Sequence, residues 1–179
     1  MLLKLFKYFF HNKDFPDLEN LDLPEANKKI LKIINKNYIL KKYYYDCYKI
    51  IKPITKEFIE PTILEIGSGS GFIKDLYPNI ILSEVVYMDW VDIVFDARLI
   101  PFKDNSISII YLLNVFHHIQ NIESFLNECD RVLKKNGYVL MIEPANTFIP
   151  RFILKNFHHE DFDEKADWFL SKGGRLTDA

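Results

Sequence analysis

The stretch Ile63-Leu64-Glu65-Ile66-Gly67-Ser68-Gly69-Ser70-Gly71-Phe72 decides the fold of this chain. It begins as a short apolar strand and runs directly into a turn with glycine at every second position. We expect this turn to open a helix. A strand, a glycine turn and a helix N-terminus together form a nucleotide cradle, because backbone N–H groups converge there and the missing Cβ atoms let a ligand approach closely.

The glycine spacing indicates which nucleotide ligand fits. A dinucleotide fingerprint reads G-x-G-x-x-G, and its third glycine packs the helix against the strand. Here Gly71 comes one residue early, and Phe72 fills the place of the small residue. Glu65, two residues before the first glycine, is placed to receive a cationic group of the ligand. The spacing argues against a nicotinamide-dependent oxidoreductase, which stays as one alternative.

Further landmarks follow the glycine turn in a fixed order. They are a strand over residues 80–84 that ends at Glu84, a strand over 92–95 followed by Asp96-Ala97, a strand over 107–112 followed by Asn114-Val115-Phe116-His117-His118, a helix over about 122–134, and a strand over 138–143. Together with the acid-x-G-x-G-x-G pattern, this order resembles the class I S-adenosylmethionine-dependent methyltransferases, in their small-molecule branch. The resemblance covers residues 61–145, about half of the chain.

The alternation of short apolar strands with helical connections is typical of an α/β fold with a parallel sheet. We expect a Rossmann-like sheet in which right-handed crossovers give the strand order 3-2-1-4-5. The length predicts one domain over 1–179, with a helical cap over 1–60, a cofactor-binding core over 61–145 and an incomplete C-terminal segment over 146–179. The usual strands 6 and 7 look missing there, so the fifth strand is expected to be an exposed edge that promotes self-association.

The resemblance implies S-adenosylmethionine as the cofactor and assigns its contacts. The expected binding residues are Glu65 for the methionine ammonium, Gly67, Ser68, Gly69 and Gly71 in the loop, Glu84 for the ribose diol, Asp96 and Ala97 for adenine, and Asn114 beside the methionine part. Glu84 lies near the spacing from the first glycine that is expected of a ribose-binding acid. Asp89 and Asp92 are the alternatives for this role.

His117 and His118 are the candidate catalytic residues. A histidine beside the acceptor could take a proton from it, because the unperturbed pKa of imidazole lies near neutrality. The alternative is that the pair fixes its loop by hydrogen bonding. A metal site built from Glu143 and the His158-His159-Glu160-Asp161 segment is not expected, because no histidines stand four residues apart.

Two aromatic or apolar segments before the core allow two interpretations each. Tyr43, Tyr44, Tyr45 and Tyr48 recur at helical spacing within an expected helical region over 24–51, so they either cap the acceptor pocket or belong to the core. Residues 1–10 are apolar apart from Lys4 and Lys7. A helix there could make peripheral membrane contact or pack against the protein.

Composition limits the class of protein. The chain has 179 residues, a formal net charge of −2, 49% hydrophobic and 27% charged residues, which is an ordinary globular balance. The net charge is too close to zero for a nucleic-acid binder held by phosphate contacts. Cys47 and Cys129 show no metal or disulfide spacing and predict free thiols in a reducing compartment, so we expect a cytoplasmic protein.

The sequence therefore predicts methyl transfer from S-adenosylmethionine to an O, N or C atom of a small-molecule or lipid-like acceptor. The sulfonium methyl group is already activated, so the protein mainly positions donor and acceptor. The alternative is a degenerate, non-catalytic module that only binds S-adenosylmethionine.

Overall fold

The computed structural model describes residues 24–143 of the chain. Three expectations concern residues outside this range: the membrane-contacting segment 1–10, the His158–Asp161 cluster and the C-terminal segment 146–179. They stay predictions. None of the helices within 24–143 is long and apolar enough to cross a membrane.

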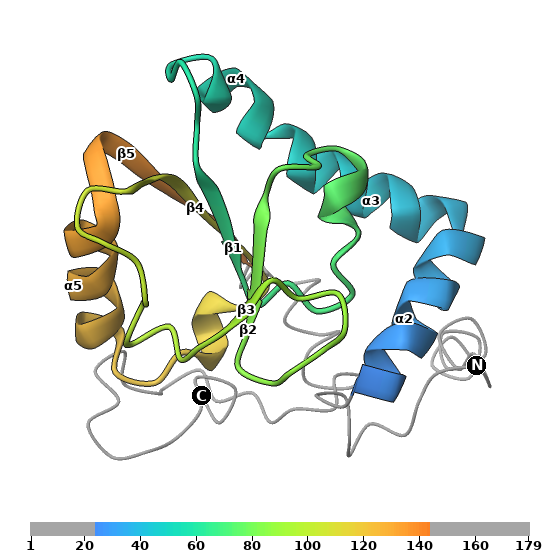
Figure 1. The fold of residues 1–179 in the computed structure, drawn as a ribbon. Coiled ribbons are helices and arrows are strands. Elements are labelled where there is room, and N and C mark those ends of the chain that lie inside the picture. Colours follow the sequence, from blue (N-terminus) through green and yellow to red (C-terminus); the bar gives the residue numbers. More distant parts are fainter. Residues whose placement is uncertain (1–23, 144–179) are drawn as a thin grey trace, which may run out of the picture.

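The described residues form a five-stranded parallel sheet in the order β3-β2-β1-β4-β5, which confirms the predicted topology (Figure 1). The strands are β1 (Ile63–Ile66), β2 (Ile81–Glu84), β3 (Ile93–Val94), β4 (Ile107–Leu113) and β5 (Leu133–Ile142). Every residue of the central strands β1 and β4 is buried. A strand covered on both faces is expected to be mostly apolar, and these two segments are apolar apart from Glu65 in β1 and Ser108 in β4.

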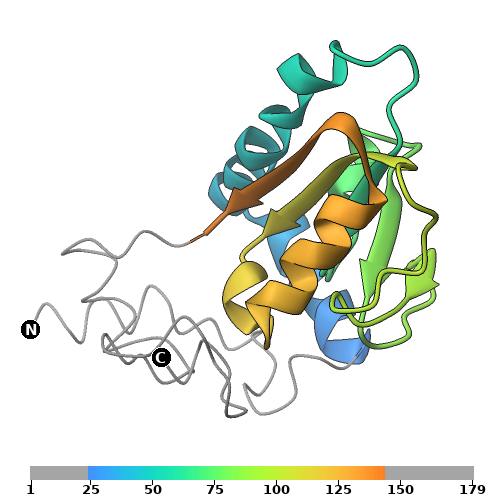
Figure 2. The same cartoon turned by 90° about the vertical axis from the view of Figure 1, so that its left-hand side faces the viewer.

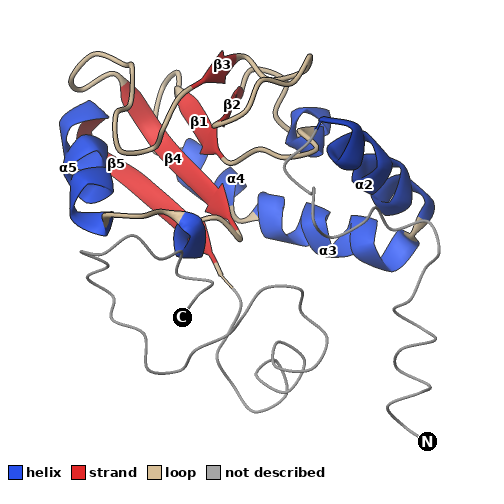
Figure 3. Cartoon of the chain, turned by 90° about the horizontal axis from the view of Figure 1, so that it is seen from below, coloured by secondary structure: helices blue, strands red, loops and turns tan. Residues whose placement is uncertain are grey.

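Helices cover both faces of the sheet (Figures 2 and 3). On one face lie α2 (Pro24–Lys36), α3 (Tyr38–Lys49) and α4 (Ile51–Thr55), whose Tyr48 and Ile51 belong to the core cluster of Tyr111. On the other face, α5 (Ile122–Val132) belongs with Leu64 to a second cluster. The helices N-terminal to the sheet therefore form a cap over one face, as predicted.

Local structure refines the prediction at one place and differs from it at two. The region over 24–51 is helical as expected but is divided at Asn37, whose Oδ1 accepts the N–H groups of Ile39 and Leu40 and so caps α3. The glycine turn leads into a 3₁₀ helix, η2 (Phe72–Asp75), rather than a full α-helix. Pro78 stands three residues beyond η2, and proline disfavours helical angles in the residue before it, so little chain is available for a longer helix.

The second difference concerns α5. The helical spacing of apolar residues over 122–134 predicts that Leu126 faces the sheet together with Phe125 and Cys129, but Leu126 is 45% exposed. Phe125, Cys129 and Val132 are buried and define the inner face of the helix. Since successive helical residues are rotated by about 100°, the neighbour of a fully buried Phe125 points away from the sheet.

The strand β5 lies at the edge of the sheet formed by the described strands. Its pairing with β4 is irregular: Ile107 pairs with Leu133, but Ile109 already pairs with Tyr138. Asn136, with a φ of 61°, lies in the extra segment between these two pairs. From Tyr138 on, the pairing is regular up to Ile142, so β5 delivers its carboxyl end beside that of β4.

Candidate active site

A cavity of about 690 Å³ opens at the carboxyl ends of the parallel strands. Its walls come from the glycine loop, from the segments that follow β2, β3 and β4, and from α2 and α3. Ligands of open α/β sheets bind at this edge. The predicted site residues that line the cavity are Glu65, Gly67, Ser68, Gly69, Glu84, Asp96, Ala97, Asn114, His117 and His118.

The three glycines of the loop serve different purposes. All have positive φ, at 68°, 47° and 68° for Gly67, Gly69 and Gly71. A Cβ on Gly67 would lie 2.4 Å from a methyl group of Val115, and one on Gly71 would lie 2.6 Å from the Trp90 ring. These two positions need glycine for packing, and Gly71 does not line the cavity, contrary to prediction.

Gly69 is the glycine that leaves room for a ligand. The nearest atom to a Cβ built there is Oδ1 of Asn27, at 3.4 Å. The loop around it is held by neighbours on both sides: Trp90 Nε1 donates to the Gly69 carbonyl at 2.8 Å, and Ser70 Oγ donates to the Asn27 carbonyl at 3.2 Å. The backbone on both sides of the open position at Gly69 is therefore held by hydrogen bonds.

Ser68 and Ser83 tie the loop to the two strands below it. Ser83 Oγ donates to the Glu65 carbonyl at 2.7 Å, and the Ser83 N–H donates to Ser68 Oγ at 3.1 Å. The Ser68 N–H in turn donates to the Ser83 carbonyl at 3.0 Å. The sequence predicted Ser68 as a cofactor residue and gave no role to Ser83.

Glu84 lies where a ribose-binding acid is expected. Its Oε1 accepts the Gly69 N–H at 2.8 Å, and its Oε2 accepts the Val85 N–H at 3.1 Å. The carboxylate is thus fixed at the end of β2, against the open glycine, and it lines the cavity. Carboxylate oxygens are hydrogen-bond acceptors, which is what the two hydroxyl groups of a ribose diol need.

The two alternatives to Glu84 are engaged in ion pairs. Asp89 pairs with Lys28 of α2 at 3.2 Å, and Asp92 pairs with Lys74 of η2 at 2.7 Å. Neither is among the described residues that line the cavity. The geometry therefore favours Glu84 over Asp89 and Asp92.

Glu65 is a buried carboxyl group at the floor of the cavity. It is 2% exposed, and its Oε2 has no hydrogen-bond partner among the described residues. Its pKa is raised from 4.5 to about 8, mainly by burial. A hydrogen bond from Ser68 opposes this rise, and the charge of Glu84 adds to it. An unpaired buried carboxyl beside a cavity is a natural partner for a cationic ligand group.

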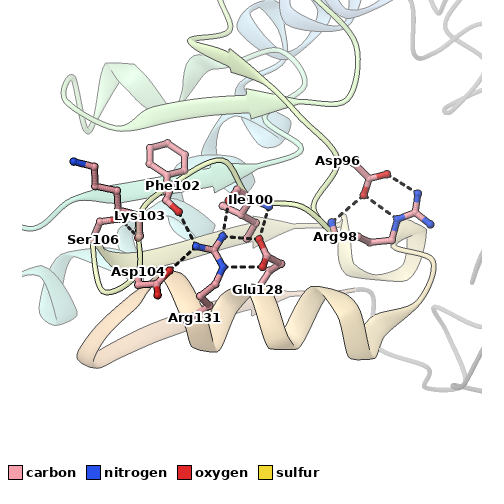
Figure 4. Close-up of polar contacts among 9 residues, drawn as sticks. All are labelled: Asp96, Arg98, Ile100, Phe102, Lys103, Asp104, Ser106, Glu128 and Arg131. Carbon is pink, nitrogen blue, oxygen red and sulfur yellow. Dashed lines mark hydrogen bonds and ion pairs between the residues drawn. The ribbon is translucent and has the colours of Figure 1, made fainter.

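The segment after β3 holds Asp96 in a way that the sequence did not predict. Arg98 forms a fork with the Asp96 carboxylate, and both side chains line the cavity (Figure 4). Ala97, between them, is buried. The hydrogen bonds from Arg98, working against burial, hold the pKa of Asp96 below its usual range.

The loop after Asp96 is pinned to α5 by Arg131 (Figure 4). The guanidinium donates to the carbonyls of Ile100 and Phe102, at 2.7 and 2.9 Å, and to the carboxylates of Glu128 and Asp104. Each end of this segment therefore has its own arginine. Arg98 lines the cavity, whereas Arg131 does not line it and instead fixes the backbone of the loop.

His117 is held by a carboxylate from the next strand. Nδ1 of His117 contacts Oε2 of Glu143, and Oε1 of Glu143 accepts the N–H groups of Val115 and Phe116 at 3.0 and 2.8 Å. Burial by itself would raise the pKa of Glu143. The hydrogen bond and the charge of His117 lower this pKa, as do the hydrogen bonds from the two backbone N–H groups, and together they outweigh burial. The rings of His117 and His118 lie 4.1 Å apart.

Glu143 is a residue of the candidate site that sequence reasoning missed. The sequence considered it only as part of a metal site, and the described residues contain no group of side chains that could hold a metal ion. A signal was available: parallel neighbours end at the same edge, so an acid at the end of β5 is expected to meet the residues that follow β4. Asn114 marks that turn with a φ of 56°.

Two tyrosines of α3, Tyr44 and Tyr48, belong to the core cluster on the face of the sheet that the cap covers. The rings of Tyr44 and Tyr48 pack against Phe72 with centroids 5.1 and 5.2 Å apart, and Tyr45 lies 6.1 Å from it. Tyr44 and Tyr48 also line the cavity, whereas Tyr43 is 47% exposed. Phe72, the residue that breaks the dinucleotide fingerprint, is thus the anchor of the helical cap.

These residues fit S-adenosylmethionine on the geometry alone. The unpaired Glu65 carboxyl suits the ammonium group, the Glu84 carboxylate suits the ribose diol, and the Asp96 carboxylate suits an amino group of adenine. Gly69 leaves the backbone accessible between them. The individual contacts stay predictions.

Comparison with known proteins gives one family match and one curated relative. Residues 64–141 match the methyltransferase domain family. A hybrid PKS-NRPS synthetase, iccA, of Talaromyces variabilis is 23% identical over 190 residues, which cover 86% of this chain and 5% of that protein. The chain thus corresponds to about a twentieth of the length of this relative.

Solved structures show the same fold. The CurJ carbon methyltransferase superposes with a TM-score of 0.55 at 15% identity, covering 76% of this chain and 44% of that one. The DszA carbon methyltransferase gives a TM-score of 0.51 at 16% identity, covering 73% and 42%. The nicotinamide-dependent alternative is wrong, because the glycine loop lies within the methyltransferase match. This chain carries a class I S-adenosylmethionine-dependent methyltransferase domain, and S-adenosylmethionine is its cofactor.

Proposed function

We propose that this domain methylates a small-molecule or lipid-like acceptor whose reacting atom must lose a proton, and that His117 takes that proton. The observation that carries the proposal is the pairing of His117 with Glu143 at the cavity wall. The alternative is that His117 and His118 only fix the loop by hydrogen bonding. That function does not need a carboxylate on the imidazole, because Glu143 already binds two backbone N–H groups of the loop.

The pairing defines which nitrogen of His117 acts. An ionised Glu143 can only accept a hydrogen bond, so in the neutral form of the His117 imidazole the proton lies on Nδ1 and the lone pair on Nε2. The lowered pKa of Glu143 keeps it ionised at neutral pH. A carboxylate on Nδ1 also stabilises the imidazolium that forms when Nε2 accepts a proton. His117 is therefore oriented and poised as a general base.

The remaining cavity residues bind and orient. Glu65, Glu84 and Asp96 would hold the ammonium, ribose and adenine of S-adenosylmethionine, and Ala97 and Asn114 would complete the wall. When bound, the cofactor supplies a methyl group on a positively charged sulfur. The helical cap, with Tyr44 and Tyr48 at the cavity, would exclude water and place the acceptor in line with that group.

A carbon acceptor is the first class to test. Two structural neighbours carry the name carbon methyltransferase, and the curated relative is a hybrid PKS-NRPS synthetase. A carbon between two carbonyl groups is acidic enough for an imidazole base to deprotonate, and a carbon nucleophile needs such a base before it attacks. Oxygen and nitrogen acceptors are the other two classes to be tested.

The test is transfer of a labelled methyl group to three probes: a β-ketoacyl thioester, a phenol and a primary amine. We expect the thioester to be methylated, and His117→Ala to reduce its turnover about 10²–10⁴-fold with little change in cofactor affinity. Unchanged turnover in His117→Ala would refute the base assignment. If S-adenosylhomocysteine binds but no probe is methylated, the non-catalytic alternative gains support.

We also propose that the domain works in a reducing compartment such as the cytoplasm, on an acceptor other than nucleic acid. Cys47 and Cys129 are free, and burial raises the pKa of the Cys129 thiol to about 12, which keeps it unreactive. The net charge of −2 supplies no excess of cations for phosphate contacts.

A further inference from the structure

Asp96 and Arg98 form a closed local unit at the cavity wall. Oδ1 of Asp96 accepts the Arg98 backbone N–H and its Nε, both at 2.9 Å, and Oδ2 accepts Nη2 at 2.5 Å (Figure 4). The two residues are separated by Ala97 alone, so the unit needs no help from distant parts of the chain. A side chain that binds its own backbone two residues on is a stable turn.

Folding stability does not explain this unit. The side chains of Asp96 and Arg98 are 48% and 43% exposed. Ion pairs of such exposure contribute little to the free energy of unfolding, because water screens them. The structural need of the loop is met by Arg131, which binds the carbonyls of Ile100 and Phe102. The place of Arg98 at the cavity points to a ligand instead.

The hydrogen bonds leave one acceptor position of Asp96 open. An ionised carboxylate offers about four such positions. Arg98 fills two on Oδ1 and one on Oδ2, and no other donor within residues 24–143 reaches this carboxylate. Arg98 therefore fixes the Asp96 carboxylate but fills only three of its four acceptor positions, and the open position is on Oδ2.

We propose that Arg98 is a positioning residue for the adenine base of the cofactor: it locks the Asp96 carboxylate so that the last acceptor position of Oδ2 receives the exocyclic amino group. The proposal rests on S-adenosylmethionine as the cofactor. Arg98 acts through orientation rather than charge, because an Asp96 without its partner is still ionised at neutral pH.

This geometry predicts selectivity for adenine over its deaminated form. Hypoxanthine carries a carbonyl oxygen where adenine carries the amino group, so a locked carboxylate would face an acceptor and lose a hydrogen bond. A carboxylate free to rotate could turn away from that oxygen. Loss of Arg98 should therefore reduce the preference for the adenine ligand without weakening the binding of the deaminated ligand.

The experiment is calorimetric titration of the full chain with S-adenosylhomocysteine and with S-inosylhomocysteine. The variants are Arg98→Ala, Arg98→Lys and Asp96→Ala. The control is Lys42→Ala, which removes an equally exposed ion pair, with Asp46 on α3, away from the cavity. We expect wild type and Lys42→Ala to prefer the adenosyl ligand at least tenfold, and Asp96→Ala to lose this preference.

For Arg98→Ala we expect the ratio of the two affinities to fall at least threefold, with the inosyl ligand bound as well as before or better. Arg98→Lys should resemble the alanine variant, because an ammonium group cannot form the two parallel bonds of the fork.

Four outcomes would overturn the proposal. An unchanged ratio in Arg98→Ala would make the fork a surface pair without function. Tighter binding of the adenosyl ligand in Arg98→Ala would make Arg98 a competitor of adenine. A wild-type ratio in Asp96→Ala would place adenine elsewhere. Failure of the wild type to bind either ligand would remove the cofactor assignment as well, and only this last outcome would also defeat the proposed function.

Discussion

The two sides of the cavity are built on different principles. On the cofactor side, at the ends of β2 and β3, the carboxylates of Glu84 and Asp96 are fixed by backbone or side-chain groups of adjacent loops, as Asp96 is by Arg98. On the acceptor side, at the ends of β4 and β5, His117 depends on Glu143, which reaches it from another strand. The Asp96–Arg98 unit on the first side is local in sequence, whereas the second side exists only when β4 and β5 are paired.

The largest expected effect tests the acceptor side. Glu143→Gln would place an amide where Nδ1 of His117 needs an acceptor, so the imidazole can adopt the wrong tautomer. We expect turnover with the best methyl acceptor to fall about 10²-fold or more, while S-adenosylhomocysteine binds within about threefold of wild type. Glu123→Gln, on the exposed first turn of α5, is the control. Parallel loss of turnover and cofactor affinity would show that the two sides are not independent.

The next effect concerns Glu84 on the cofactor side. Glu84→Ala removes a charged acceptor that the ribose would use, and such hydrogen bonds are worth about 1.5–3 kcal/mol. We expect this loss in calorimetric binding of S-adenosylmethionine and almost none for methionine, which has no ribose. Asp89→Ala is the matched control, because Asp89 pairs with Lys28 outside the cavity. A greater loss in the control would mean that Asp89 binds the ribose.

Gly69 and Gly71 separate ligand approach from packing. Gly69→Val should lower the affinity for S-adenosylmethionine at least tenfold, or about 1.4 kcal/mol, because its side chain enters the open position of the loop. Gly71→Ala should instead lower the thermal unfolding temperature, since its Cβ collides with Trp90. Wild-type affinity in a folded Gly69→Val protein would contradict the assignment of the loop.

The last prediction concerns the buried carboxyl group of Glu65. Its pKa is raised from 4.5 to about 8 in the folded, ligand-free protein, so between these values the folded state holds a proton that the unfolded state has released. The free energy of unfolding should therefore decrease as the pH rises through this window, by at most about 1.4 kcal/mol per pH unit, and level off above it.

Urea unfolding at pH 5.5 and 7.5 measures this dependence. Glu65→Gln is uncharged at both pH values and should be the flatter of the two proteins. The difference between wild type and variant isolates Glu65 from the other titrating groups. Equal slopes in both proteins would show that Glu65 titrates normally.

The strand order and most of the cofactor side could be predicted from the sequence. Strand order follows from right-handed crossovers, and the ends of parallel strands share one edge, so Glu65, Glu84 and Asp96 had to converge. Only the geometry could distinguish Glu84 from the alternative acids Asp89 and Asp92, because the lysine partners of these two lie on α2 and η2.

The misses have a common physical origin. The fork of Arg98 depends on a side-chain rotamer, and the roles of Gly67 and Gly71 depend on contacts with Val115 and Trp90 that lie far away in the sequence. Glu143 required the register of β5 against β4. Residue patterns predict which backbone segments meet, but they do not predict which side chains then touch.

Trp90 gives this loop a built-in optical reporter. Its indole N–H is bonded to the carbonyl of Gly69, its ring lies against Gly71, and the Lys28 ammonium lies 5.6 Å from its ring centroid. Indole emission responds to hydrogen bonding and to nearby charge, so a ligand that alters the loop should change the fluorescence of Trp90. The chain has one other tryptophan, Trp168, and its replacement by phenylalanine would leave a single emitter beside the glycine loop.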